Sequence, residues 1–200
     1  MDNTYKGVGK EHAFTAIVGS DILGSGFKPY SKYLSDYFNS GGSLICVHSK
    51  EEDKGLDYLS ELLEIDLNYI NREGRIIFIC RDDYLKEGSM DIIGLLNAIE
   101  KGLNNLNKKG FNSNQVYITV DWIWCSMGKD KLRFTYNRLK AMSKARNARF
   151  IFGYIIENLK KEHIRHLLRN QKILLRCGVN DFEIYDSCQR MFQSLTLLSK

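Results

Sequence analysis

Short runs, most of them apolar, alternate with segments of helical periodicity along this sequence, and this alternation limits the fold more than any other feature. Uninterrupted apolar runs bounded by turn residues are typical of strands that are buried on both faces. Seven such runs predict strands, at 13–18, 44–47, 75–80, 116–120, 150–156, 172–175 and 182–185. The longest helical stripe between them consists of Ile92, Leu95, Leu96, Ile99, Leu103 and Leu106. We therefore predict an α/β fold with a mainly parallel central sheet, helices on both faces, and a closing strand pair that can be antiparallel.

The length and the lack of linkers indicate one folded unit. The chain has 200 residues, a single proline and no tract rich in Ser, Gly and Pro. A chain of this length can bury a large core without disulfides or metals. We predict a polar segment at 1–10 followed by a single domain at 11–200. Because 1–11 lacks an apolar signal-peptide core and no run reaches the length of a membrane span, we expect a cytoplasmic protein without membrane contact.

The cysteines and histidines argue against a metal site. The five cysteines are an odd number, and no two of them have the spacing of a Cys-x-x-Cys motif. His163 and His166 are three residues apart on a basic helix, but no acid or cysteine motif accompanies them. Zinc sites need such clusters, so we predict no metal and no cofactor.

The charge is unevenly distributed along the chain. The net charge is +5, yet 129–176 carries 14 Lys and Arg against three acids, a net +11, which leaves −6 for the remainder. This pattern is typical of solvated helix faces, the interpretation we favour, or of a surface for phosphate, nucleic acid or an acidic partner. Because the basic residues lack interleaved aromatics and any known signature, we expect nucleic-acid binding to be weak, non-specific and sensitive to salt.

Ligands of parallel sheets gather outside the carboxyl ends of the strands. The segments that follow the predicted strands are 19–26, 48–52, 81–84, 121–124 and 154–157. Aromatic side chains there would supply apolar contact, and a few polar groups would fix the orientation of a ligand. On this basis, and with a histidine that opens the first strand, the predicted ligand-binding residues are His12, Asp121, Trp122, Trp124 and Tyr154. Each has a structural alternative, because the tryptophans can be core anchors, Asp121 a cap and His12 a packing residue.

The segment after the first predicted strand has the form of a phosphate-binding loop. Gly19 and Gly24 fit the frame G-x-x-x-x-G between a strand and a helix. Ser25 and Gly26 then occupy the positions at which an active loop has Lys and Ser or Thr. The lysine neutralises the β- and γ-phosphates and the hydroxyl holds magnesium. We therefore interpret the loop as degenerate and predict no catalytic residues.

Acidic residues follow two other predicted strands. Glu51 and Glu52 come after the second strand, and Asp121 ends the fourth. The acidic pair can equally be the first turn of a helix, where acids favour the helix dipole. Together with the glycine-rich loop, this order of parts resembles the RecA/KaiC-like core. The resemblance places Glu51 and Glu52 near the paired acids of KaiC-type proteins and Asp121 at a metal-orienting acid.

A second resemblance covers about 11–178. After His12, its segments occur in the order 38–47, 65–74, 83–88, 120–122 and 153–158. In order and spacing these segments resemble the MEDS domain, the sensory domain of DcmR-like regulators, which is itself related to the RecA/KaiC fold. The unusually glycine-rich first loop and the tail from Val179 depart from that pattern. The resemblance implies a sensor of small, often hydrocarbon-like molecules that acts through a kinase or a transcription factor.

These observations predict a non-catalytic sensory or regulatory domain that binds a small molecule or a signalling partner at the strand ends. No helix-turn-helix or kinase region is visible, so the resemblance implies a stand-alone sensor, and a homodimer is left open. Two alternatives are a residual RecA/KaiC-like nucleotide-binding protein or NTPase, and a nucleic-acid-binding regulator that uses the basic surface. The sequence does not identify the ligand or the downstream partner.

Overall fold

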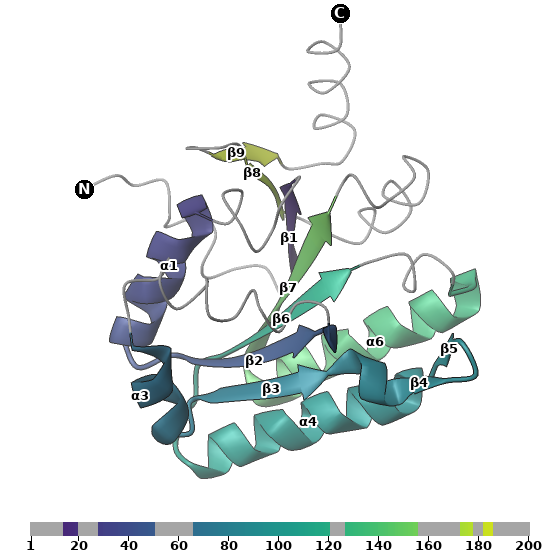
Figure 1. Cartoon of the computed structure of the whole chain (residues 1–200), viewed down its shortest axis with the longest axis horizontal. Coiled ribbons are helices and arrows are strands. Elements are labelled where there is room, and N and C mark those ends of the chain that lie inside the picture. Colours follow the sequence, from purple (N-terminus) through teal and green to yellow (C-terminus); the bar gives the residue numbers. More distant parts are fainter. Residues whose placement is uncertain are drawn as a thin grey trace, which may run out of the picture.

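The computed structural model describes residues 14–19, 28–50, 66–120, 127–155, 173–177 and 182–185. Within these residues, seven strands form one sheet in the order β3-β2-β6-β7-β1-β8-β9 (Figure 1). All neighbouring strands are parallel except β8 and β9, which are antiparallel. The predicted sheet and its antiparallel closing pair are therefore confirmed.

The strands lie within two residues of the predicted bounds. They are β1 (Phe14–Gly19), β2 (Ser43–His48), β3 (Ile76–Cys80), β6 (Asn114–Val120), β7 (Ala148–Ile155), β8 (Ile173–Cys177) and β9 (Phe182–Tyr185).

A separate antiparallel hairpin, β4 (Leu85–Lys86) and β5 (Ser89–Met90), follows β3. Its two turn residues, Glu87 and Gly88, have φ of 50° and 75°. Two successive left-handed residues are typical of the two-residue turn that matches the twist of a hairpin.

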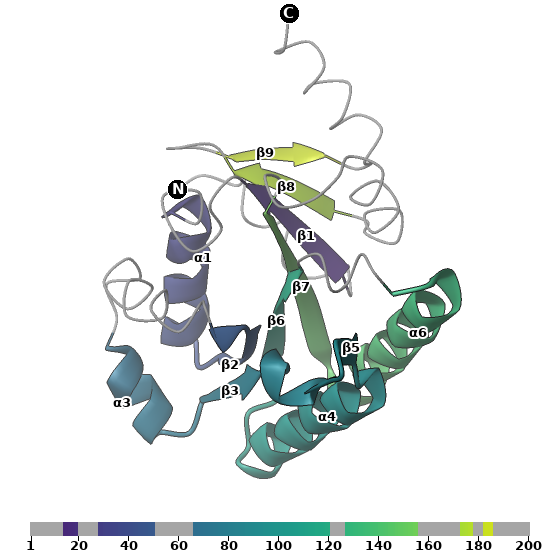
Figure 2. The same ribbon diagram turned by 45° about the vertical axis from the view of Figure 1, so that its right-hand side comes forward.

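Helices cover the sheet on both faces. The helices are α1 (Lys28–Asn39), α3 (Leu67–Arg72), the 3-10 turn η4 (Arg81–Tyr84), α4 (Ile92–Lys108) and α6 (Lys129–Arg146). Figure 2 shows α1 and α3 on one side of the sheet and α4 and α6 on the other. Helical periodicity in the sequence also predicts helices around 56–63 and after Asn158, and both segments lie outside the described residues. No helix in the described part of the chain is long and apolar enough to cross a membrane.

The main core lies between the sheet and the pair α4 and α6. Alternate strand residues point to this side, because successive side chains of a strand face opposite ways. The strand residues in this core cluster include Ile45, Val47, Val116, Ile118, Phe150 and Phe152. Gly102 lets α4 approach closely, since a Cβ there would lie 2.9 Å from Cδ1 of Ile45. Burying each of these large side chains contributes about 1.5–3 kcal/mol.

Polar contacts hold the amino end of the sheet together. The Tyr37 hydroxyl of α1 donates to the Ser113 carbonyl at 2.6 Å. The Arg75 guanidinium, ahead of β3, donates to the carbonyl oxygens of Gly42 and Phe38 and lies over the Phe38 ring. These bonds satisfy carbonyls where α1 ends and β2 and β6 begin. The opposite, carboxyl edge is the side on which ligands of parallel sheets bind.

Candidate functional site

Buried polar side chains gather at the carboxyl edge of the sheet. His48, Ser49, Arg81 and Thr119 are each less than 9% exposed. They come from three different strand ends, those of β2, β3 and β6. Burying polar groups costs free energy unless they are hydrogen-bonded. Four buried polar side chains at one edge therefore indicate an ordered set of hydrogen bonds there.

Arg81 connects two strands that are not neighbours. It follows β3, and its Nη1 donates to the carbonyl oxygen of Thr119 on β6 at 3.2 Å. Because β2 lies between β3 and β6 in the sheet, the guanidinium crosses the carboxyl end of β2. Its Nε also lies 3.6 Å from Oδ1 of Asp82. The Arg81 side chain is 6% exposed and that of Asp82 22%, so water screens this ion pair only partly.

Asp82 extends the connection to β2. Its Oδ2 accepts a hydrogen bond from the backbone N–H of Lys50 at 2.9 Å. The Lys50 ammonium lies 3.7 Å from Asp83, but both side chains are more than half exposed, so that pair contributes little. Arg81 and Asp82 thus tie together the ends of β2, β3 and β6; we call these two residues the edge clamp.

His48 lies beside the edge clamp on the sheet face opposite α4 and α6. Its Nδ1 lies 3.0 Å from the carbonyl oxygen of Ser49. Because a carbonyl can only accept, Nδ1 carries the proton in this contact, and a neutral ring then has Nε2 as an acceptor. The ring meets Phe78 edge to face, with centroids 6.1 Å apart. Apolar and polar side chains are therefore packed together at this edge of the sheet.

The structure places two of the predicted site residues. Gly19 ends β1, and the backbone of Tyr154 lies in β7, in register with Val18. Both therefore lie at the carboxyl edge of the sheet. The remaining predicted residues lie outside the described residues, namely His12, Gly24, Ser25, Gly26, Glu51, Glu52, Asp121, Trp122 and Trp124.

The sequence pattern indicates 81–84 as a segment that follows a strand, but it does not identify Arg81 or Asp82 as site residues. No local pattern shows that an arginine side chain will cross a neighbouring strand. The useful signal is an ionisable residue directly after an apolar strand in an α/β fold.

The described residues contain no group of three or more His, Cys, Asp or Glu that could hold a metal ion.

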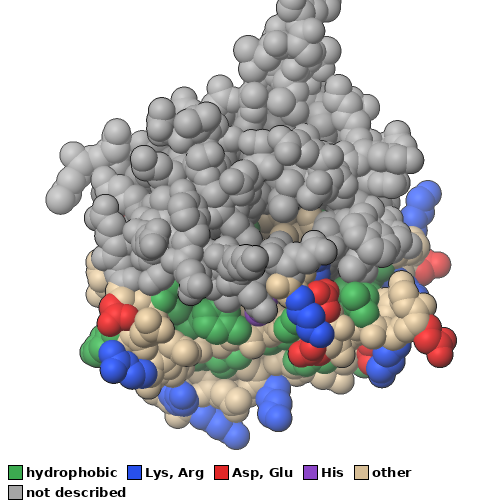
Figure 3. Space-filling model, in the orientation of Figure 1, with side chains coloured by type: hydrophobic (Ala, Val, Ile, Leu, Met, Phe, Trp, Pro, Cys, Tyr) green, Lys and Arg blue, Asp and Glu red, His purple; other side chains and the backbone are tan. Residues whose placement is uncertain are grey.

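The basic helix α6 is partly neutralised by acids of the same chain. Its sequence contains seven Lys or Arg and one acid. Arg138 and Arg146 both pair with Glu100 of α4, at 3.1 and 3.9 Å. Arg133 pairs with Asp130 at 3.2 Å. Figure 3 shows acidic and basic side chains next to one another on the right of the described surface, and mainly basic ones along its lower left rim. This mixing favours the interpretation of a solvated helix face.

The comparisons with known proteins concern the fold. No family model matches the sequence, and no curated protein matches it significantly. Among solved structures, a KaiC-like protein from the hyperthermophilic archaeon Pyrococcus horikoshii OT3 has a TM-score of 0.57 and 12% identity, over 88% of this chain and 80% of that chain. The flagellar accessory protein FlaH from Methanocaldococcus jannaschii has a TM-score of 0.55 and 12% identity, over 92% and 81%. The chain has a RecA/KaiC-like fold. At this level of identity, the similarity establishes the fold alone.

Proposed function

We propose that this protein is a non-catalytic sensory or regulatory domain that binds a small molecule or a signalling partner at the carboxyl edge of its sheet. The edge clamp is the observation that supports this most. Lys50 directly precedes Glu51, and Thr119 lies two residues before Asp121. The edge clamp therefore holds the chain where two of the candidate ligand-binding segments begin. Ligand sites in open α/β sheets are built from such loops.

The sequence of the first loop supports a non-catalytic function. Ser25 and Gly26 stand where a working phosphate loop has Lys and Ser or Thr. Without the ammonium group, the phosphates lose their main charge partner. Without the hydroxyl, magnesium loses a ligand. We therefore propose that this loop is degenerate and that nucleotide hydrolysis is negligible.

The order of segments, which resembles that of MEDS domains, supports a sensor. On this proposal, His12, Asp121, Trp122, Trp124 and Tyr154 line one pocket. The aromatic rings would contact the apolar part of the ligand, and His12 and Asp121 would orient it. The signal would pass in the cytoplasm to a regulatory protein such as a kinase or a transcription factor.

A residual nucleotide-binding protein or NTPase is the second candidate. The RecA/KaiC-like fold favours it, because Glu51 and Glu52 follow β2 and Asp121 follows β6 in that fold. Acids at these strand ends could orient magnesium or water beside a nucleotide.

Steady-state hydrolysis of ATP with magnesium separates the two candidates. We expect the wild-type rate to equal background, with no change in a Glu51→Gln/Glu52→Gln variant. Turnover above background that disappears in that variant would replace the sensor with an NTPase. The same variant therefore also serves as the control for a contaminating ATPase, whose activity would survive the substitution.

A further inference from the structure

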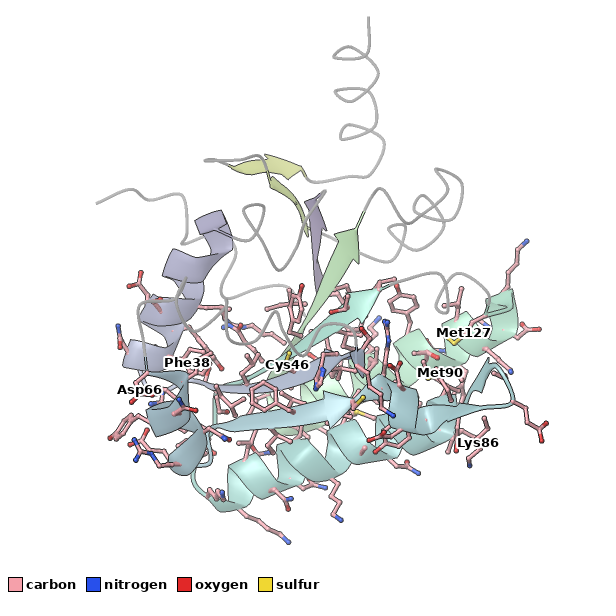
Figure 4. All side chains as sticks on the ribbon, viewed as in Figure 1. Phe38, Cys46, Asp66, Lys86, Met90 and Met127 are labelled. Carbon is pink, nitrogen blue, oxygen red and sulfur yellow. The ribbon has the colours of Figure 1, made fainter. Side chains whose placement is uncertain are left out.

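A cavity lies between the β4–β5 hairpin and the start of α6. Its volume is about 390 Å³, which is within the range of small-molecule sites. Its described lining includes Met90, Met127, Gly128, Lys129, Asp130 and Lys131. Figure 4 labels Met90 and Met127 in this region, beyond the end of the sheet.

Two methionines form the apolar part of the cavity lining. Met90 and Met127 are 6% and 8% exposed, and both belong to the main core cluster. Methionine is unbranched and polarisable, so its thioether adjusts to ligands of different shape. This wall suits an aliphatic or aromatic body.

The rim of the cavity is positively charged. Lys129 and Lys131 lie on either side of Asp130 in the wall. The Asp130 carboxylate is 3.2 Å from the guanidinium of Arg133, which offsets its charge. On the hairpin side, Lys86 and Asp91 form a pair at 2.8 Å. The two wall lysines and Arg133 outnumber the two exposed acids Asp130 and Glu87, so the rim carries a small net positive charge.

Gly128 lines the cavity without a side chain. Its φ of −62° and ψ of 159° suit any residue, so the backbone does not require glycine there. A side-chain oxygen would also cap α6 better than glycine does. A Cβ at Gly128 would meet nothing within 4 Å. The missing side chain therefore leaves free space at the wall of the cavity.

We propose that this cavity binds a small amphipathic anion, with its apolar body against Met90 and Met127 and its anionic head near Lys129 and Lys131. This proposal does not rest on the function proposed for the strand ends. Both tryptophans of the chain precede Met127 by five residues or fewer, so their emission is a convenient probe of binding.

Three probe molecules test the apolar contact and the charge contact separately. Octanoate carries both an apolar body and a carboxylate, acetate lacks the body, and 1-octanol lacks the charge. Titrations followed by calorimetry and tryptophan emission should show saturable binding of octanoate, with acetate and 1-octanol at least about tenfold weaker. Equal affinity for octanoate and 1-octanol, or no saturable binding of octanoate to the folded protein, would overturn the proposal.

Three variants, one of them a control, locate the site. Lys129→Gln/Lys131→Gln should weaken octanoate binding roughly two- to thirty-fold, the range for two exposed ion pairs. Lys140→Gln/Lys144→Gln removes the same charge from the same helix and should leave the affinity unchanged. Gly128→Val should block binding by filling the space, with a normal unfolding transition. Octanoate affinity that is unchanged in the first and third variants, or lowered equally in the control, contradicts the site.

Discussion

Replacing Arg81 by methionine tests whether the edge clamp fixes the carboxyl edge of the sheet. Methionine keeps much of the apolar stem but removes the guanidinium. The Thr119 carbonyl, on a residue that is 2% exposed, then loses this donor. A buried acceptor left in this way costs about 1–3 kcal/mol. Loss of the pair with Asp82 adds about 0.5–1 kcal/mol, and relief from burying a charge offsets part of the sum. We expect a net destabilisation of about 2–3 kcal/mol.

Urea unfolding followed by circular dichroism measures this loss. The midpoint should fall while the slope with denaturant stays the same, because the folded state keeps its compactness. Arg133→Met is the matched control, since the Arg133–Asp130 pair is 77% and 93% exposed and should contribute less than about 0.5 kcal/mol.

A double-mutant cycle isolates the pair within the edge clamp. Asp82→Asn keeps an oxygen that can accept from the Lys50 N–H but removes the charge that faces Arg81. We expect a coupling free energy of about 0.5–1.5 kcal/mol between Arg81→Met and Asp82→Asn. Additive effects, or a loss below about 0.5 kcal/mol for Arg81→Met, would show that the guanidinium does not hold the strand ends.

Two further predictions concern the scaffold. Gly42→Ala should lower stability by about 1–3 kcal/mol in thermal unfolding, because its Cβ would lie 2.4 Å from the Tyr37 ring and must displace it; wild-type stability would contradict the tight packing there. Hydrogen bonds from Lys86 and from the Gly94 N–H lower the pKa of Asp91, so its stabilising effect is complete above the unfolded pKa of about 3.9 and is lost as the pH falls through the folded pKa. Asp91→Asn should therefore be less stable than wild type near pH 7, and the two melting temperatures should converge in acid; a gap that does not change with pH would contradict this.

The strands and the longer helices could be predicted from the sequence because burial leaves a strong pattern. A strand covered on both faces is apolar throughout, as in β2 and β7, and a helix packed on a sheet shows a stripe, as in α4. The hydrophobic stripe of α6 extends only from Leu132 to Met142, so it predicts the middle of the helix. The helix itself runs Lys129–Arg146. Its ends are polar and carry no hydrophobic signal.

The hairpin and the edge clamp could not be predicted in the same way. Strands of two residues, such as β4 and β5, are too short to show a period of two. The contact from Arg81 to Thr119 joins residues 38 apart in the sequence and passes over a third strand. Only the order of strands in the folded sheet brings these groups together. The sequence could still indicate the carboxyl edge as the region in which to look for a ligand, because the rule for parallel sheets depends on topology and not on individual side chains.

Native mass spectrometry of the purified protein tests the central proposal most directly. We predict a bound small molecule, one per chain, whose mass is not that of ATP or ADP. Trp122→Ala should lose this molecule, whereas Lys140→Ala on the basic helix and Gly128→Val in the separate cavity should keep it. A bare wild-type chain, a nucleotide with magnesium, or a bound molecule that survives in Trp122→Ala would contradict a non-catalytic sensor site at the carboxyl edge of the sheet.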